Sequence, residues 1–223
     1  MSSARAWLAV ALALGAWACG GGTGGGEPRR PAERDVQSWV RLLRSGDVYE
    51  RRQAGAALAA AGPAAVGPLG ALLRDPHPAV REQATRALAR IGPEARPDLE
   101  RALLDSNGAV RRAAADGLSH GPARSLAGFD QALHAPHHRV REDALAALPA
   151  FGAAALPRLQ AVASEDPDVR VRRAAVEALG RLGEAARPAL AALARSEAAG
   201  VRAAARRELR RLGAGKRDGR GDG

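Results

Sequence analysis

A nine-residue pattern recurs six times along this chain of 223 residues. In every copy the second residue is Arg, the fifth is Ala and the ninth is Leu. The copies start 30 or 31 residues apart, at Glu50, Val80, Val110, Val140, Val171 and Val201. Periods of this length are typical of proteins built from stacked units that fold against their neighbours. The pattern therefore favours a repeat array over a domain with one central core.

Each repeat is predicted to hold two helices. At 100° per residue, the first, fifth, eighth and ninth positions of the pattern lie on one helical face and form an apolar stripe. Leucine-rich segments such as EARPDLERALLD lie between the copies and supply a second helix. Glycines mark the helix ends at positions 62, 92, 121, 152 and 183, and Pro follows three of them. Because 46% of the residues are hydrophobic but only 3% aromatic, we expect an all-α fold with closely packed small side chains.

Two residues depart from the pattern. Pro149 lies directly after the last residue of the fourth copy and is predicted to end that helix early. Glu208 occupies the eighth position of the sixth copy, where the other copies have Ala or Gly. We expect Glu208 to face water, as in a terminal repeat that caps an array.

The repeated residues resemble a known family. A leucine-rich helix followed by DPxxxVRxxAxxAL and Gly is similar to HEAT repeats, in particular the short bacterial type named after phycobilisome lyases. The resemblance covers residues 34–213 and implies an α-solenoid of six HEAT-like helical hairpins with a period of about 30 residues.

The second-position arginines are predicted to form a structural ladder. Their aliphatic stems can pack at the edge of the stripe while the guanidinium groups reach an Asp or the carbonyls of a turn. Asp75, Asp105 and Asp166 precede three of these arginines by six residues and are the expected partners. The ladder consists of Arg51, Arg81, Arg111, Arg141 and Arg172, with Arg202 in the same column.

The next column is predicted to point away from the core and to line the inner surface. Its charges alternate, which favours pairing between neighbouring repeats over a uniform track for a polyanion. The candidate partner-binding residues are Arg52, Glu82, Arg112, Glu142 and Arg173, with Ala203 last in the column.

A candidate basic patch lies in the last repeat. It is either a binding surface for anionic lipid or an acidic protein, or a solvated capping face. The patch consists of Arg202, Arg206, Arg207, Arg210 and Arg211.

The N-terminal segment is predicted to direct export. Residues 1–18 resemble a signal peptide, with Arg5 before an apolar stretch. Cys19, the only cysteine, follows Ala16-Trp17-Ala18 in a sequence similar to a bacterial lipobox, which implies lipidation and an anchor in the envelope, favouring the outer membrane or periplasm. Simple secretion and an uncleaved cytoplasmic chain are the alternatives. Residues 19–33 are expected to form a flexible tether and residues 214–223 a disordered tail.

No catalytic motif or cofactor site is predicted. His134, His137 and His138 surround one turn but have no Cys or acidic residue beside them at ligand spacing, so we expect no metal site. Deoxyhypusine hydroxylases, which use similar repeats, bind iron through His-Glu pairs, and no His here is followed by Glu. The resemblance to phycobilin lyases is limited to scaffold residues.

The sequence therefore predicts a non-enzymatic scaffold of the bacterial cell envelope that binds a protein or peptide. An enzyme or enzyme subunit on a HEAT scaffold, bilin lyase-like or oxidoreductase-like, is one alternative. A nucleic-acid-binding HEAT protein is another, given a formal net charge of +10, but export would separate it from nucleic acid. We expect no nucleic acid, no small-molecule substrate and no cofactor.

Overall fold

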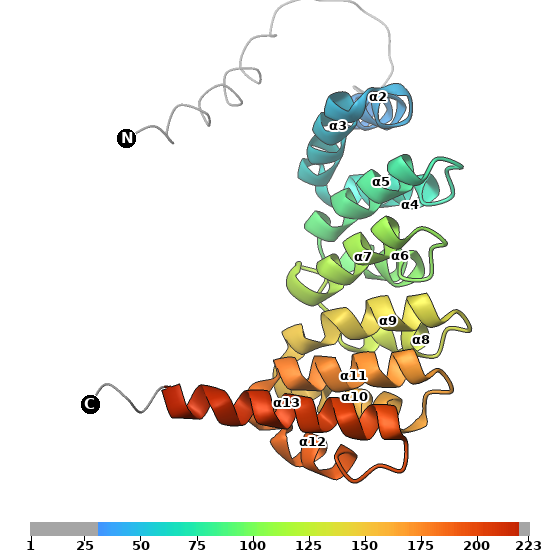
Figure 1. Ribbon diagram of the computed structural model, residues 1–223. Helices are drawn as coiled ribbons and strands as arrows, with labels where there is room; N and C mark the ends of the chain where they lie inside the picture. The colour runs from blue at the N-terminus through green and yellow to red at the C-terminus, as the bar shows by residue number, and fades with distance from the viewer. Residues whose placement is uncertain (1–30, 219–223) are drawn as a thin grey trace, which may run out of the picture. The chain divides into compact units, whose positions relative to one another are not determined.

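The computed structural model describes residues 31–218, which form helices and no strand. They fold into six hairpins, confirming the all-α repeat array (Figure 1). The hairpins pair α2 (Pro31–Ser45) with α3 (Val48–Ala60), α4 (Val66–Leu72) with α5 (Pro78–Ile91), α6 (Arg96–Ala102) with α7 (Gly108–His120), α8 (Asp130–Leu133) with α9 (His138–Ala147), α10 (Leu156–Glu165) with α11 (Val169–Arg181), and α12 (Arg187–Leu193) with α13 (Ala199–Asp218).

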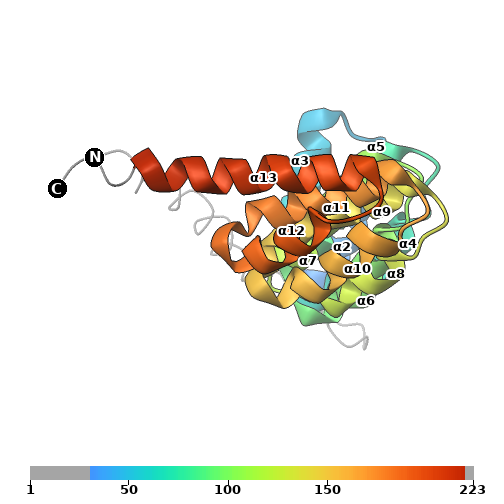
Figure 2. The same cartoon turned by 60° about the horizontal axis from the view of Figure 1, so that its bottom comes forward.

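The hairpins stack so that their helices form two layers (Figures 1 and 2). The second helix of each hairpin contacts the second helix of the next, from α3 through α13. The predicted stripe lies between them: the fifth-position alanines are all buried, and so are the ninth-position leucines except the last, Leu209, which is partly buried. Phe129 is the one aromatic side chain that is fully buried in the described part of the chain. The core therefore consists of small and branched aliphatic groups in continuous register.

Each first helix after α2 is preceded by a 3₁₀ segment that begins at, follows or contains a glycine. Gly62, Gly152 and Gly183 have φ angles of 65°, 60° and 66°, a conformation that L residues rarely adopt. The turns are η2 (Gly62–Ala65), η3 (Pro93–Ala95), η4 (Ala127–Phe129), η5 (Leu148–Ala155) and η6 (Gly183–Ala186).

The fourth hairpin departs from this arrangement. Gly121 has a φ of −78° and is followed by an irregular stretch, and α8 spans only four residues. Pro149 acts as expected: α9 ends at Ala147 and is shorter than α5, α7 and α11. Residues 138–165 are long and apolar enough to span a membrane by composition, but they consist of α9, η5 and α10 with non-helical backbone at Gly152.

The ends of the array differ from the expected boundaries of 34 and 213. Helix α2 begins at Pro31, because proline is well suited to the first turn of a helix. Helix α13 continues past Gly213 to Asp218, so the first half of the expected tail is helical. The signal peptide, most of the tether including Cys19, and residues 219–223 lie outside the described residues.

Candidate functional site

The second-position arginines bind the turn of their own hairpin. In Arg81, Arg111, Arg141, Arg172 and Arg202, Nη1 donates hydrogen bonds to the carbonyl oxygens five and six residues earlier, at 2.6–3.2 Å. Arg51 Nη1 donates to the Gly46 carbonyl. One guanidinium thus satisfies carbonyls at the end of each turn, where the helical ladder leaves them without partners.

The acidic partners of the ladder come from the following hairpin. Arg81 donates to both carboxylate oxygens of Asp105 at 2.8 and 2.9 Å, and Arg141 donates to both of Asp166 at 2.7 and 2.9 Å. We predicted that each Asp pairs with the arginine six residues later. The backbone carbonyl of the Asp does accept from that arginine, but its carboxylate does not, so the prediction is wrong for the carboxylate. The offset arises because stacking places the turn of one hairpin beside the guanidinium of the preceding one.

In these bidentate pairs, the pKa values of Asp105, Arg81 and Arg141 are shifted toward the charged forms. Burial alone would raise the pKa of Asp105, but hydrogen bonds from Arg81 and from the Asn107 amide outweigh it and hold that pKa below its usual value. The hydrogen bonds that Arg81 and Arg141 donate to Asp105 and Asp166 raise the pKa values of the two arginines. The Arg81–Asp105 pair therefore joins two hairpins through groups that stay ionised at neutral pH.

The ladder is irregular at two positions where the turn lacks Asp. Ala135 stands in the fourth turn, and Arg111 donates instead to Asp143 of α9 at 2.7 Å. Ser196 stands in the sixth turn, and the Nε atom of Arg172 is buried without a hydrogen-bond partner. Arg172 is thus attached to its own turn but not to the next hairpin.

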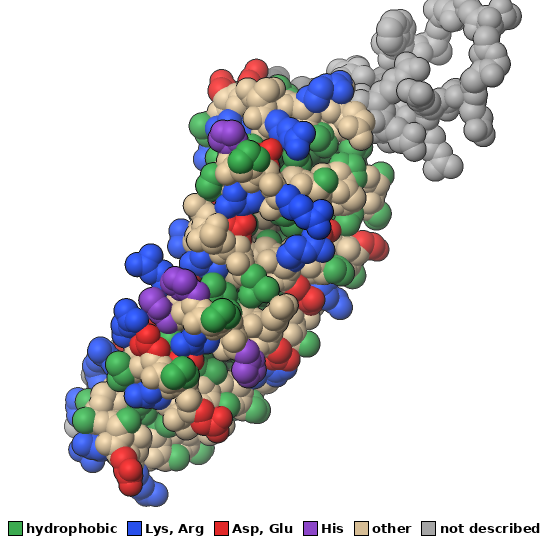
Figure 3. Space-filling view, turned by 90° about the vertical axis from the view of Figure 1, so that its right-hand side faces the viewer, with side chains coloured by type: hydrophobic (Ala, Val, Ile, Leu, Met, Phe, Trp, Pro, Cys, Tyr) green, Lys and Arg blue, Asp and Glu red, His purple; other side chains and the backbone are tan. Residues whose placement is uncertain are grey.

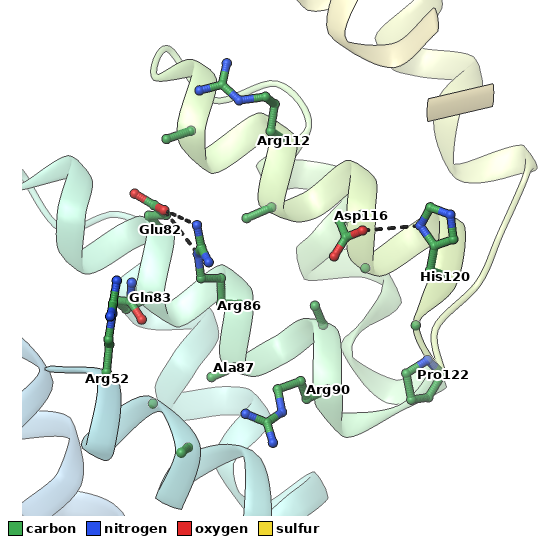
Figure 4. A pocket seen from close by; sticks show the side chains of 17 residues that line it. Arg52, Glu82, Gln83, Arg86, Ala87, Arg90, Arg112, Asp116, His120 and Pro122 are labelled. Carbon is green, nitrogen blue, oxygen red and sulfur yellow. Dashed lines mark hydrogen bonds and ion pairs between the residues drawn. The ribbon is translucent and has the colours of Figure 1, made fainter. Parts of the chain in front are cut away.

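A groove of about 990 Å³ lies across α3, α5 and α7 (Figure 4). Three of the five predicted partner-binding residues, Arg52, Glu82 and Arg112, line it, one from each helix. Glu142 lines a smaller pocket of about 560 Å³, which Arg112 also borders, and Arg173 lines neither. The structure therefore gathers the first three members of the column in one groove, places Glu142 beside Arg112 in the second pocket and leaves Arg173 outside both.

The expected pairing of this column between neighbouring repeats is not found in the described residues. Glu82 instead accepts hydrogen bonds from Arg86 of its own helix, at 2.6 and 3.1 Å. Residues four apart on one helix are close neighbours. The column residues, in contrast, lie on different helices. The alternating signs are therefore not evidence of a paired ladder.

Several charged residues of the groove were not predicted from the repeat columns. Arg86 and Arg90 follow Glu82 at intervals of four, and Asp116 and His120 follow Arg112 in the same way, so each set lies on one helical face. This spacing of four was the signal available. Asp116 contacts His120 at 3.2 Å, whereas Arg52, Arg90 and Arg112 have no ion pair or hydrogen bond within residues 31–218.

The floor of the groove is made of small residues. A Cβ atom on Gly117 would lie 2.5 Å from the Ala89 Cβ, and one on Gly121 would lie 2.7 Å from the Ala89 carbonyl oxygen. Glycine is required at these positions because α5 and the end of α7 approach each other closely. Gly55 also lines the groove but has only ordinary contacts.

The candidate basic patch on α13 is partly used for packing. Arg207 pairs with Glu177 at 3.0 Å, Arg211 donates to the Gly180 carbonyl at 2.8 Å, and Arg202 holds its own turn. Arg206 and Arg210 are exposed and have no such partner within the described residues.

The expectation that Glu208 faces water is wrong. Its side chain is only 9% exposed, it lies against Gly180, and Arg211 pairs with it at 2.8 Å. A glutamate fits here because Gly180 leaves room for it on α11.

The turns hold no group of side chains arranged for metal binding in residues 31–218. His137 and His138 stack with ring centroids 4.9 Å apart, and His134 Nδ1 contacts the Asp130 carbonyl at 2.7 Å. Figure 3 shows the side of the array that carries the turns, where acidic side chains and histidines are interspersed with arginines.

The stacked hairpins, the arginine ladder and the groove define a helical repeat protein of the α-solenoid class. The family model for HEAT repeats matches residues 36–119 and 126–210. The chain therefore belongs to the HEAT-repeat family. A search of curated proteins found no match.

Three solved structures illustrate what this chain is similar to. The CpcE–CpcF complex of phycocyanin lyase from Nostoc sp. PCC7120 is 22% identical, with 79% of this chain and 98% of that chain covered and a TM-score of 0.41. Human deoxyhypusine hydroxylase is 16% identical, with 82% and 97% covered and a TM-score of 0.36. A designed armadillo repeat protein is 24% identical, with 79% and 99% covered and a TM-score of 0.39.

Proposed function

We propose that this protein is a non-enzymatic interaction scaffold of the bacterial cell envelope, which holds a protein or peptide partner in the groove across α3, α5 and α7. The observation that carries the proposal is the groove itself, where Arg52 and Arg112 are exposed over a floor of Ala and Gly. Such a floor lets a partner backbone approach closely, while charged groups at the rim give specificity. The ladder arginines act as scaffold, because their guanidinium groups are occupied by turns and carboxylates.

Site-specific photo-crosslinking tests this function. Ala56 is exposed and lines the groove, so a photoreactive phenylalanine derivative at this position should form a discrete adduct with a protein partner in the envelope. Ala161 of α10 is exposed outside the groove and is the matched control. Adducts of the same kind from both positions, or from neither, would contradict the proposed surface.

We also propose that Cys19 carries a lipid that anchors the chain to the envelope. The support is the lipobox-like sequence before Cys19 and the absence of a second cysteine in the chain. Radiolabelled palmitate should be incorporated into the wild type and not into Cys19→Ala. Lack of label in the wild type would remove the anchor and leave the groove proposal intact.

A further inference from the structure

The groove contains positive charge that no group of the described chain neutralises. Of its two carboxylates, Glu82 is paired with Arg86 and Asp116 contacts His120. Arg52, Arg90 and Arg112 come from three different helices, and none of them has an ion pair or hydrogen bond within residues 31–218 (Figure 4). Each guanidinium offers five N–H donors and no acceptor, so these residues are complementary to a ligand that supplies several acceptors with negative charge.

The spacing of the helices fits a short extended peptide. Neighbouring packed helices lie roughly 9 to 10 Å apart, so α3 and α7 are separated by about 20 Å. An extended chain rises about 3.3 Å per residue, and about six residues therefore cross the three helices. Because alternate side chains of an extended peptide share one face, acidic residues at every second position would reach the arginines together.

A peptide fits this groove better than a nucleic acid does. Glu82 and Asp116 would lie close to a phosphate backbone, which favours uniform positive charge. No Phe, Tyr or Trp side chain lines the groove, so bases would lack the large aromatic surfaces on which single strands stack. The backbone of a peptide can instead approach the small residues Gly55, Ala87 and Ala113.

We propose that the groove binds an acidic, extended peptide segment of the partner protein, with carboxylates paired to Arg52, Arg90 and Arg112. This inference rests on the proposed function, because it names the chemistry of the partner at the same surface. It also assigns a binding role to Arg90, which the repeat columns do not include.

Fluorescence anisotropy with defined peptides tests the inference. The probe is a labelled ten-residue peptide that alternates Glu and Ala, and the comparison peptides replace Glu with Gln or with Lys. The first variant is Arg52→Gln/Arg90→Gln/Arg112→Gln, which removes three exposed arginines that have no partner in the fold. The matched control is Arg173→Gln/Arg206→Gln/Arg210→Gln, which removes the same charge from exposed residues outside the groove.

The groove variant should bind the Glu peptide at least about tenfold more weakly than the wild type, because three close charge pairs are lost. The control variant should change the affinity by less than about twofold, and circular dichroism should show that both variants are folded. Raising the salt concentration should weaken binding, since the pairs are near solvent. An equal loss in both variants would overturn the inference, because it would show a response to net charge alone.

The outcomes separate this inference from the proposed function. Equal binding of the Gln and Glu peptides, lost when Ala113→Trp fills the groove, would overturn the acidic preference and retain a peptide-binding scaffold. Tighter binding of a ten-nucleotide thymidine strand than of the Glu peptide would overturn the choice of a peptide. Failure of all three peptides to bind would overturn the inference, and the Ala56 adduct would then decide whether the proposed function stands.

Discussion

The first three hairpins and the last two contain similar numbers of exposed arginines but use them differently. In the groove, Arg52, Arg90 and Arg112 have no partner within the described chain. Between α11 and α13, Arg207 and Arg211 join the two helices through Glu177 and the Gly180 carbonyl. The difference shows that a binding surface cannot be identified from a high net charge alone. What distinguishes the groove is that three guanidinium groups without acceptors, from three different helices, line one cavity, whereas Arg206 and Arg210 lie on a single helix and line neither pocket.

The largest expected effect tests whether paired arginines carry stability. Arg141 and Asp166 have side chains that are 8% and 4% exposed, so Arg141→Ala would leave a buried carboxylate without its partner. We expect a loss of about 3–5 kcal/mol in the free energy of unfolding, measured in urea. Arg112→Ala in the groove should cost less than about 0.5 kcal/mol. Similar losses in the two variants would break the distinction between the regions.

Acidification should weaken the ladder through Asp105. The folded-state pKa of Asp105 lies below its usual value of 3.8, so its charge stabilises the fold above that pH, and this contribution is lost as the pH falls through the folded-state pKa. Asp105→Asn should lower the free energy of unfolding by about 2 kcal/mol at pH 7, with a smaller difference below about pH 4. Asp116→Asn, exposed in the groove, should show almost no difference at either pH. If the difference in free energy of unfolding between the wild type and Asp105→Asn were the same at both pH values, the pairing would be contradicted.

Two glycine substitutions test how closely the helices approach beneath the groove. Gly117→Ala places a methyl group 2.5 Å from the Ala89 Cβ and should lower the free energy of unfolding by about 1–2 kcal/mol. Gly55→Ala meets its nearest atom at 3.7 Å and should raise that free energy by about 0.5–1 kcal/mol, because alanine favours the helix. Thermal unfolding measured by circular dichroism distinguishes the two, and stabilisation by both would show that α5 and α7 are not tightly packed.

A modest gain in stability is expected at the sixth turn. Ser196→Asp should supply a carboxylate to the buried Nε of Arg172, as Asp105 does for Arg81, and should stabilise the fold by about 1 kcal/mol. Ala135→Asp should give less, since Arg111 already has Asp143. The gain from Ser196→Asp should vanish in an Arg172→Gln background, as a double-mutant cycle would measure.

Much of the fold could be predicted because the same pattern recurs six times. The helical faces, the buried Ala and Leu columns and the early end of α9 at Pro149 all follow from local spacing. The partners of the charged groups did not follow, since they depend on how one hairpin sits on the next. Asp105 therefore pairs with Arg81 rather than Arg111, and Glu208 is buried because Gly180 on another helix makes room for it.

Only part of the groove could be predicted from the sequence. Arg52, Glu82 and Arg112 share one column, so their common surface could be predicted. Arg90 belongs to a different column and reaches the same groove from farther along α5. The groove covers only the first three hairpins because side chains from several helices line it. No single repeat contains all of these side chains.

The arginine ladder also gives the array a head-to-tail polarity. Each link joins an arginine of one hairpin to an aspartate of its successor, as in the pairs Arg81–Asp105 and Arg141–Asp166. One hairpin can therefore replace another only when its turn supplies an Asp to the arginine of the preceding hairpin. Excision of the fourth hairpin, whose turn has Ala135 instead, would bring Arg111 opposite Asp166, so the array could be shortened by one module while Arg111 keeps an aspartate partner in the hairpin that follows it.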